Sequence, residues 1–201
     1  MTDDARQFAP ATARNREPIL EILRRVLPSQ GLVLEVSSGT GEHATFFAPQ
    51  LSGLTWQPSD PDPAARASIA AWTAATGATN VRPPLALDAR ADVWPLTRAA
   101  AIVCINMIHI APWEAALGLF AGASRILVKG SPLVLYGPFK RGGEHTAPSN
   151  AAFDASLRAR DPSWGVRDLD SVVAAAAQAG LGLFEVVAMP ANNLSVVFTV
   201  L

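Results

Sequence analysis

The chain has 201 residues, of which 50% are hydrophobic and 16% are charged, and its formal net charge is -1. This composition excludes an intrinsically disordered chain, and the near-neutral charge argues against nucleic-acid binding, which needs an excess of Lys and Arg. The single cysteine, Cys104, excludes an internal disulfide and a cysteine-cluster metal site. The polar residues 1–10 and the lack of an apolar run near ~20 residues predict a cytoplasmic protein without a secretory leader or membrane span. We expect one domain over residues 1–201.

The first half of the chain alternates between helix and strand signals. Asn15 is a good helix N-cap and Pro18 suits a first turn, so residues 1–30 are predicted to form an N-terminal helical cap. Asp62 followed by Pro63 predicts the start of another helix, which ends near residue 77. The other elements expected in this half are strands at 32–36 and 54–57, a helix at 41–51 and a short strand at 85–87.

The second half continues this alternation and ends differently. Asp168 predicts the start of a helix that Gly180 stops. The strands at 181–188 and 194–200 have only a turn between them and should be antiparallel. The remaining elements expected are strands at 100–105 and 133–136, a helix at 113–124, and a substrate-side loop and helix within 137–167. Continuous apolar strands between helices predict an α/β fold with a seven-stranded, mostly parallel sheet, a C-terminal antiparallel hairpin and helices on both faces.

A glycine motif follows the first predicted strand. Gly39 and Gly41, with Ala44 three residues further on, fit the glycine pattern of nucleotide-binding loops, in which a strand ends, the backbone turns sharply and a helix begins. Glycine at such a turn also lets the backbone approach a ligand closely. Alone the pattern is weak, because Gly-x-Gly turns are common.

Three acidic residues strengthen the motif. Glu35 lies in the first strand, and Asp60 and Asp88 follow the next two strand candidates, so each carboxylate is expected at the carboxyl edge of the sheet. A carboxylate can accept hydrogen bonds from both hydroxyls of a ribose or from an amine. NAD(P) carries a pyrophosphate that disfavours an acidic neighbour, whereas S-adenosylmethionine (SAM) carries a sulfonium and an ammonium that Glu35 can favour. Local capping or pairing remains the alternative for Glu35.

The combination of motifs resembles class I SAM-dependent methyltransferases and, more closely, a little-characterised family of methyltransferase-like proteins long labelled a domain of unknown function. The segments that carry the resemblance are residues 13–20, 38–43, 56–60, 106–110, 135–139, 148–150, 161–169 and 189–193. They cover nearly the whole chain. The resemblance implies the methyltransferase fold and SAM as cofactor, with S-adenosylhomocysteine as product, and it implies no particular acceptor.

Residues after the fourth and fifth strand candidates are expected to face the transferred methyl group. Asn106 could orient an acceptor through its amide, His109 could act as a general base, and Tyr136 could line the pocket, although packing roles remain open for each. Asn15 and Arg16 would lie at the pocket entrance if the first helix crosses it. The catalytic candidates are therefore Asn106, His109 and Tyr136, and the cofactor-binding candidates are Glu35, Ser37, Gly39, Gly41, His43, Asp60, Asp88, Asn106 and Met107.

These features predict a SAM-dependent methyltransferase with a small-molecule acceptor and with no metal, nucleic-acid or membrane partner. The three histidines lack a metal-ligand spacing on one element. Two alternatives stay open: a non-catalytic SAM- or adenosyl-binding sensor or partner module, and an NAD-dependent oxidoreductase on a related fold. The oligomeric state is not predicted.

Overall fold

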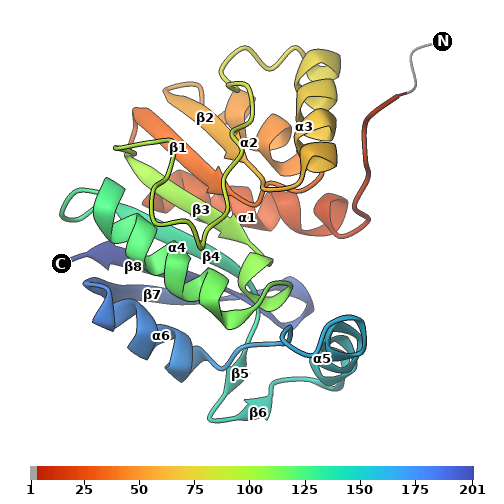
Figure 1. The fold of residues 1–201 in the computed structure, drawn as a ribbon, viewed down its shortest axis with the longest axis vertical. Coiled ribbons are helices and arrows are strands. Elements are labelled where there is room, and N and C mark those ends of the chain that lie inside the picture. Colours follow the sequence, from red (N-terminus) through yellow and green to blue (C-terminus); the bar gives the residue numbers. More distant parts are fainter. Residues whose placement is uncertain (1–3) are drawn as a thin grey trace.

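The computed structural model describes residues 4–201 and shows helices packed around one central sheet (Figure 1). Residues 1–3 of the polar N-terminal segment lie outside the described residues. The elements in chain order are α1 Thr12–Val26, β1 Gly31–Val36, α2 Glu42–Gln50, β2 Leu54–Ser59, α3 Pro63–Thr76, β3 Ala101–Ile105, η1 Met107–His109, α4 Trp113–Ile126, β4 Pro132–Pro138, β5 Lys140–Arg141, β6 Glu144–His145, α5 Pro148–Arg160, α6 Leu169–Gln178, β7 Leu181–Met189, η2 Pro190–Asn192 and β8 Asn193–Val200.

The central sheet has the strand order β2-β1-β3-β4-β8-β7. Strands β2, β1, β3 and β4 run parallel, whereas β8 is antiparallel to both β4 and β7. The predicted C-terminal antiparallel hairpin is therefore confirmed. The chain leaves β1 toward β2 and later returns to place β3 on the other side of β1, so the strand order reverses between β1 and β3. Ligands of open α/β sheets bind beside the carboxyl ends of the strands at such a point.

The sheet contains six strands, so the prediction of seven is wrong. The segment expected to form a strand at 85–87 meets β2 only through an isolated bridge between Leu85 and Ser59, and a second isolated bridge pairs Val81, before that segment, with Trp56. Pro83 and Pro84 lie between the two bridges. Because proline has no N–H to donate, two in succession interrupt the hydrogen-bond ladder that a strand requires.

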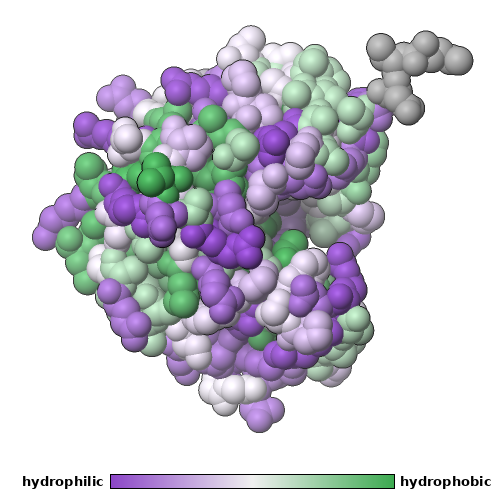
Figure 2. Space-filling model, in the orientation of Figure 1, coloured by the Kyte–Doolittle hydropathy of each residue, from purple (hydrophilic) through white to green (hydrophobic). Residues whose placement is uncertain are grey.

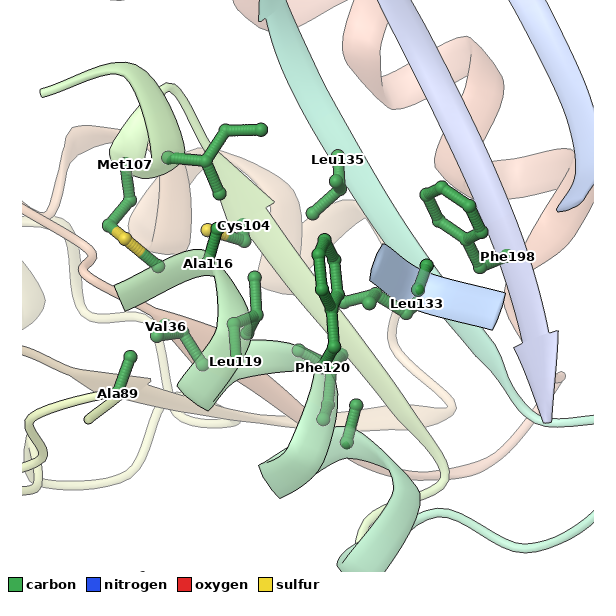
Figure 3. Close-up of a cluster of buried hydrophobic side chains, with 14 of the residues drawn as sticks. Val36, Ala89, Cys104, Met107, Ala116, Leu119, Phe120, Leu133, Leu135 and Phe198 are labelled. Atoms are coloured by element: carbon green, nitrogen blue, oxygen red, sulfur yellow. The ribbon is translucent and has the colours of Figure 1, made fainter. Parts of the chain in front are cut away.

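Each face of the sheet is covered by helices. Side chains of α4 and α6 pack with one face, and those of α1 and α2 pack with the other (Figure 1). Figure 3 shows part of the first core, where Phe120 of α4 packs toward the sheet residues Leu133 and Phe198. The centroids of the Phe120 and Phe198 rings are 6.1 Å apart. The predicted two-sided burial explains why β3 is apolar and buried along its whole length.

The first residues of the helices can be compared with the N-caps predicted from the sequence. Asp62 accepts a hydrogen bond from Ala64 N, and Asp168 caps α6 in the same way, so both predicted N-caps are confirmed. Asn15 is not an N-cap, because α1 begins at Thr12, after a turn that contains Pro10. The helix therefore includes Asn15, whose side chain is used elsewhere.

The region 137–167 holds the β5–β6 hairpin and α5, beyond the end of β4 (Figure 1). Among residues 4–201, no helix combines the length and the apolar character needed to cross a bilayer.

Candidate functional site

The loops that follow β1, β2, β3 and β4 meet at one edge of the sheet. Two non-glycine residues there, Ser37 after β1 and Asn106 after β3, have positive φ angles of 58° and 63°. Such angles are uncommon outside glycine and gather at functional sites. They mark the two strand ends that flank the reversal of strand order.

The two motif glycines have different tasks. Gly41 has φ of +89°, and a Cβ atom there would lie 2.7 Å from the Cα of Ile69, so this glycine lets the loop pack against α3. Gly39 has φ of +55°, and a Cβ atom there would meet no atom within 4 Å. The backbone at Gly39 therefore borders open space, as a loop that contacts a ligand requires.

Asp60 lies next to this loop at the end of β2. Its Oδ2 accepts a hydrogen bond from Gly39 N at 3.0 Å and its Oδ1 accepts one from Asp62 N at 2.9 Å. The carboxyl group is 7% exposed, and burial raises its pKa against the lowering effect of these two backbone donors. Each carboxylate oxygen can accept a second hydrogen bond, so Asp60 is held in place with capacity left for a ligand.

Glu35 lies beneath the loop and is only 1% exposed. Its Oε2 accepts a hydrogen bond from Trp56 Nε1 at 2.8 Å. Burial raises the pKa of Glu35 to about 7, although hydrogen bonds from Trp56 and Ser38 oppose the shift. The carboxyl group thus links β1 to β2 under the loop, and Trp56 is its partner, which the sequence did not single out.

Asp88 does not join Asp60 and Glu35 in this arrangement. Its carboxylate forms an ion pair with Arg90, 2.7 Å between Asp88 Oδ2 and Arg90 Nη2, and this hydrogen bonding lowers the pKa of Asp88. Met107 is also turned away: its side chain lies in the apolar core near Cys104 (Figure 3).

A cavity of about 280 Å³ opens beyond the carboxyl ends of β3 and β4. Figure 2 shows the surface hollowed between the upper part of the molecule, which carries α3, and the lower part, which carries α5. The residues that line the cavity are Ala11, Asn15, Asn106, Ile110, Tyr136, Pro138, Asn150, Phe153 and Asn193. The predicted residues Asn106 and Tyr136 are therefore brought together, as is Asn15 from α1.

Asparagines surround the hydroxyl group of Tyr136. Hydrogen bonds from Asn15 and Asn193 lower the pKa of Tyr136, but burial has the larger effect and raises it. Asn15 Oδ1 also lies 2.8 Å from His43 Nε2, and burial lowers the pKa of His43 to about 4. His43 is therefore a neutral partner of Asn15, and it stacks on Phe47 at 5.3 Å.

His109 is fully buried behind the cavity and does not line it. Its Nδ1 accepts a hydrogen bond from Arg167 N at 3.2 Å, which leaves the proton on Nε2. Burial lowers the pKa of His109 to about 3. A Cβ atom at Gly137 would lie 2.6 Å from His109 Nε2, so Gly137 is the residue that admits the ring. This placement suits a residue that positions the turn after β3 better than it suits a general base.

Asn150 and Asn193 were missed as pocket residues. Asn193 follows the turn between the last two strands, and its Nδ2 donates to Pro190 O. Asn150 lies in α5, within the region 137–167 that was expected on the substrate side, but no residue of that region was predicted to line the pocket. Only the folded chain shows that both asparagines line the same cavity as Tyr136.

The N-terminal segment is attached to the glycine loop. Ala9 N donates to Glu42 Oε2 at 2.6 Å, and Thr40 Oγ1 donates to the same oxygen at 3.0 Å. Gln7 N donates to Ser68 Oγ of α3 at 2.8 Å, and Ser68 Oγ in turn donates to Thr40 O. Residues 6–9 therefore form one wall beside the loop.

Residues 6–200 match the family described as protein of unknown function (DUF938), and the chain belongs to that family. The resemblance to a methyltransferase-like family of unknown function is thereby confirmed, and similar solved structures have the methyltransferase fold.

Three of these solved structures indicate how far the likeness extends. An O-methyltransferase family protein from Burkholderia thailandensis is 14% identical with a TM-score of 0.80, over 94% of this chain and 57% of its own. An O-methyltransferase family 2 protein from Planctomyces limnophilus in complex with apigenin is 18% identical with a TM-score of 0.77, and the match covers 95% of this chain and 60% of that protein. CalO1, a methyltransferase in calicheamicin biosynthesis in its SAH-bound form, is 18% identical with a TM-score of 0.73, and the match covers 95% of this chain and 55% of CalO1. The chain thus spans a little over half the length of these proteins.

Proposed function

We propose that this protein is a SAM-dependent methyltransferase that methylates a small-molecule acceptor. The observation that carries the proposal is the pairing of a glycine loop bordering open space, next to the fixed carboxylate of Asp60, with a separate cavity at the same edge of the sheet. The SAH-bound form of CalO1 and the apigenin complex, on the same fold, support a SAM site and a small-molecule site respectively.

The residues at the first of these places fit SAM. Asp60 offers carboxylate oxygens for the ribose hydroxyls, and Gly39 permits close approach of the backbone. Glu35 holds Trp56 and so keeps the ends of β1 and β2 in register beneath the loop. When bound, SAM supplies an electrophilic methyl group on a sulfonium, which is a good leaving group.

The main task of the protein is then to align an acceptor with that methyl group and to exclude water. Asn106 and Tyr136 lie at the ends of neighbouring strands and can orient the acceptor by hydrogen bonds. His109 and Gly137 fix the turn that carries Asn106, so they act as positioning residues.

Calorimetric titration with SAM, S-adenosylhomocysteine and NAD tests the cofactor. We expect micromolar binding of SAM and its product, and at least a tenfold loss in the variant Asp60→Asn, because an amide accepts fewer hydrogen bonds than a carboxylate. The matched control is Asp92→Asn, since Asp92 is exposed and lies beside Arg125 and Ile126 of α4. Absence of SAM binding at millimolar concentration, or tighter binding of NAD, would sink the proposal.

Catalysis is tested separately with methyl-labelled SAM and a panel of small molecules. Transfer of label to any of them supports an enzyme. SAM binding without transfer to any acceptor that binds the cavity would instead assign the protein as a sensor.

A further inference from the structure

Among residues 4–201, no charged side chain lines the cavity next to the proposed SAM site. Its nine lining residues include four asparagines and one tyrosine, and the other four are apolar. The pKa of Tyr136 is raised by burial, so its hydroxyl group stays protonated at neutral pH. An ionic substituent would have to leave water without a partner of opposite charge, which is costly. The wall therefore favours an uncharged guest.

Two asparagine side chains determine which hydrogen-bonding groups the cavity offers to a ligand. The side chain of Asn106 makes no hydrogen bond with any other residue in 4–201, so both its oxygen and its nitrogen are available. The nitrogen of Asn150 already donates to Thr146 Oγ1 at 3.1 Å and to Asn192 O at 2.9 Å. Asn150 thus offers its oxygen, and a guest that fits must carry a hydrogen-bond donor.

The rim of the cavity is apolar. Ile110 is 41% exposed and Phe153 is 38% exposed, on opposite elements of the wall. Large apolar side chains left in contact with water at the rim of a pocket favour an apolar or aromatic body in the guest. The volume of about 280 Å³ is at the small end of the range for small-molecule sites.

The lining set also contains no carboxylate, histidine, lysine or cysteine that could remove a proton. The three histidines do not line the cavity. His43 contacts Asn15, the Nδ1 atom of His109 accepts from the backbone of Arg167, and His145 Nε2 lies 3.3 Å from Asp154 Oδ2. An alcohol or an ammonium group would need such a base before it could attack. A phenol or an aromatic thiol is acidic enough to release its proton to water, and the anion then faces the positive sulfonium of SAM. It therefore has the partner of opposite charge that an ionic substituent elsewhere in the cavity would lack.

We propose, building on the proposed methyltransferase function, that the acceptor is an uncharged aromatic molecule with an acidic hydroxyl or thiol group that ionises without a protein base. The acceptor O–H or S–H group gives its proton to solvent. The oxygen or sulfur then forms a bond to the methyl carbon, the bond from that carbon to the sulfonium sulfur breaks, and its electron pair stays on the sulfur of S-adenosylhomocysteine.

Three phenols of nearly equal size test the charge preference: 4-ethylphenol, the anion 4-hydroxyphenylacetate and the cation tyramine. Their binding to the full chain saturated with S-adenosylhomocysteine is measured by calorimetry. We expect 4-ethylphenol to bind at least tenfold more tightly than either charged analogue. Equal or tighter binding of a charged analogue, or no binding of 4-ethylphenol, overturns the proposal. Failure of S-adenosylhomocysteine itself to bind overturns instead the function on which it rests.

Charge introduced at the cavity should change this order. Asn150→Asp places a carboxylate in the wall, and Phe153→Glu places one at the rim, where the side chain is already exposed. Both variants should raise the affinity for tyramine relative to 4-ethylphenol by about tenfold. Gln178→Glu, on the exposed surface of α6, is the matched control and should change nothing. An unchanged ratio of the affinities for tyramine and 4-ethylphenol in both variants contradicts the placement of the acceptor.

The loss of the acceptor's proton without a protein base can be tested by the pH dependence of methyl transfer. Methyl transfer to 4-ethylphenol, 4-nitrophenol and 4-ethylthiophenol is followed against pH, and the mid-point of each profile should follow the pKa of the acceptor. The same comparison distinguishes a hydroxyl acceptor from a thiol acceptor. One common mid-point for all three would reveal a protein base and overturn this part of the proposal.

Discussion

Glu35 is a carboxyl group that folding removes almost entirely from water, with Trp56 Nε1 as its hydrogen-bond donor. Its pKa of about 7 in the folded protein exceeds the ordinary value of 4.5. Between those two pH values the folded chain holds a proton that the unfolded chain has released. The free energy of unfolding therefore falls as pH rises from about 4.5 to 7, by about 3 kcal/mol from this group.

The variant Glu35→Gln should remove this dependence, because an amide does not titrate and its oxygen can still accept from Trp56. We expect the variant to gain stability relative to the natural chain as pH rises from 5 to 7.5, measured by urea unfolding at each pH. The difference between the two chains isolates Glu35 from His43 and His109, whose lowered pKa values make stability fall as pH falls below 6.5. Parallel profiles for the two chains would contradict the buried carboxyl group.

Gly137 is glycine because the ring of His109 leaves no room for a larger side chain. The variant Gly137→Ala brings a Cβ atom to 2.6 Å from His109 Nε2 and 3.2 Å from Asn106 Oδ1, and we expect a loss of about 1–3 kcal/mol in the free energy of unfolding. The same substitution in a His109→Ala background should cost less, since the ring that it strikes is gone. Equal costs in the two backgrounds would show that the contact with His109 is not the cause.

At the scale of elements, Asp168 connects a helix to a hairpin. Its Oδ1 accepts from Asp170 N and Ser171 N at the start of α6, and its Oδ2 accepts from Gly143 N between β5 and β6. We expect Asp168→Ala to lower the free energy of unfolding by about 1–2 kcal/mol and Asp168→Asn to lower it by less, because the single amide oxygen can still cap α6. Urea unfolding measures both. Hydrogen exchange at Gly143 N should accelerate in both variants, because an amide nitrogen in place of Oδ2 cannot accept from it. A protected Gly143 N in the alanine variant would contradict the link.

The elements were predictable where the sequence signal is local. Asp62 and Asp168 identified helix starts because an N-cap acts on its own first turn. Asn15 looked equally suitable and was misread, since its amide is used between helices, against His43. The strand expected at 85–87 does not form, because Pro83 and Pro84 just before it interrupt the hydrogen bonds to β2. The sequence alone does not show that β2 is the strand beside this segment.

At the scale of the whole molecule, the single cysteine reports on global unfolding. Cys104 is in β3 at the centre of the sheet, is 2% exposed, and has a raised pKa because of burial. We expect its reaction with a thiol reagent to require global opening, so that the free energy from labelling equals that from urea unfolding. Saturation with SAM should slow the labelling further. Rapid labelling of the folded chain would contradict this placement.

The site followed from topology more than from any one motif. Glu35, Asp60 and Asn106 were predictable together because strand ends of a parallel sheet share an edge. The sequence could not reveal that Asp88 pairs with Arg90, or that Asn150 and Asn193 approach Tyr136, because these contacts depend on loop conformation and on α5. His109 was predicted to be a general base because it is a histidine, but burial lowers its pKa and keeps it away from the cavity.

The prolines beside β2 have a consequence for how copies of the protein meet. An exposed sheet edge presents unpaired N–H groups to which a strand of another molecule can add, and this is a common start of aggregation. Beyond β2 the chain runs past Pro83 and Pro84, and β2 itself contains Pro58. Residues that cannot donate make this edge a poor template for another strand. The interruption that reduces the sheet to six strands thus also protects its border against self-association.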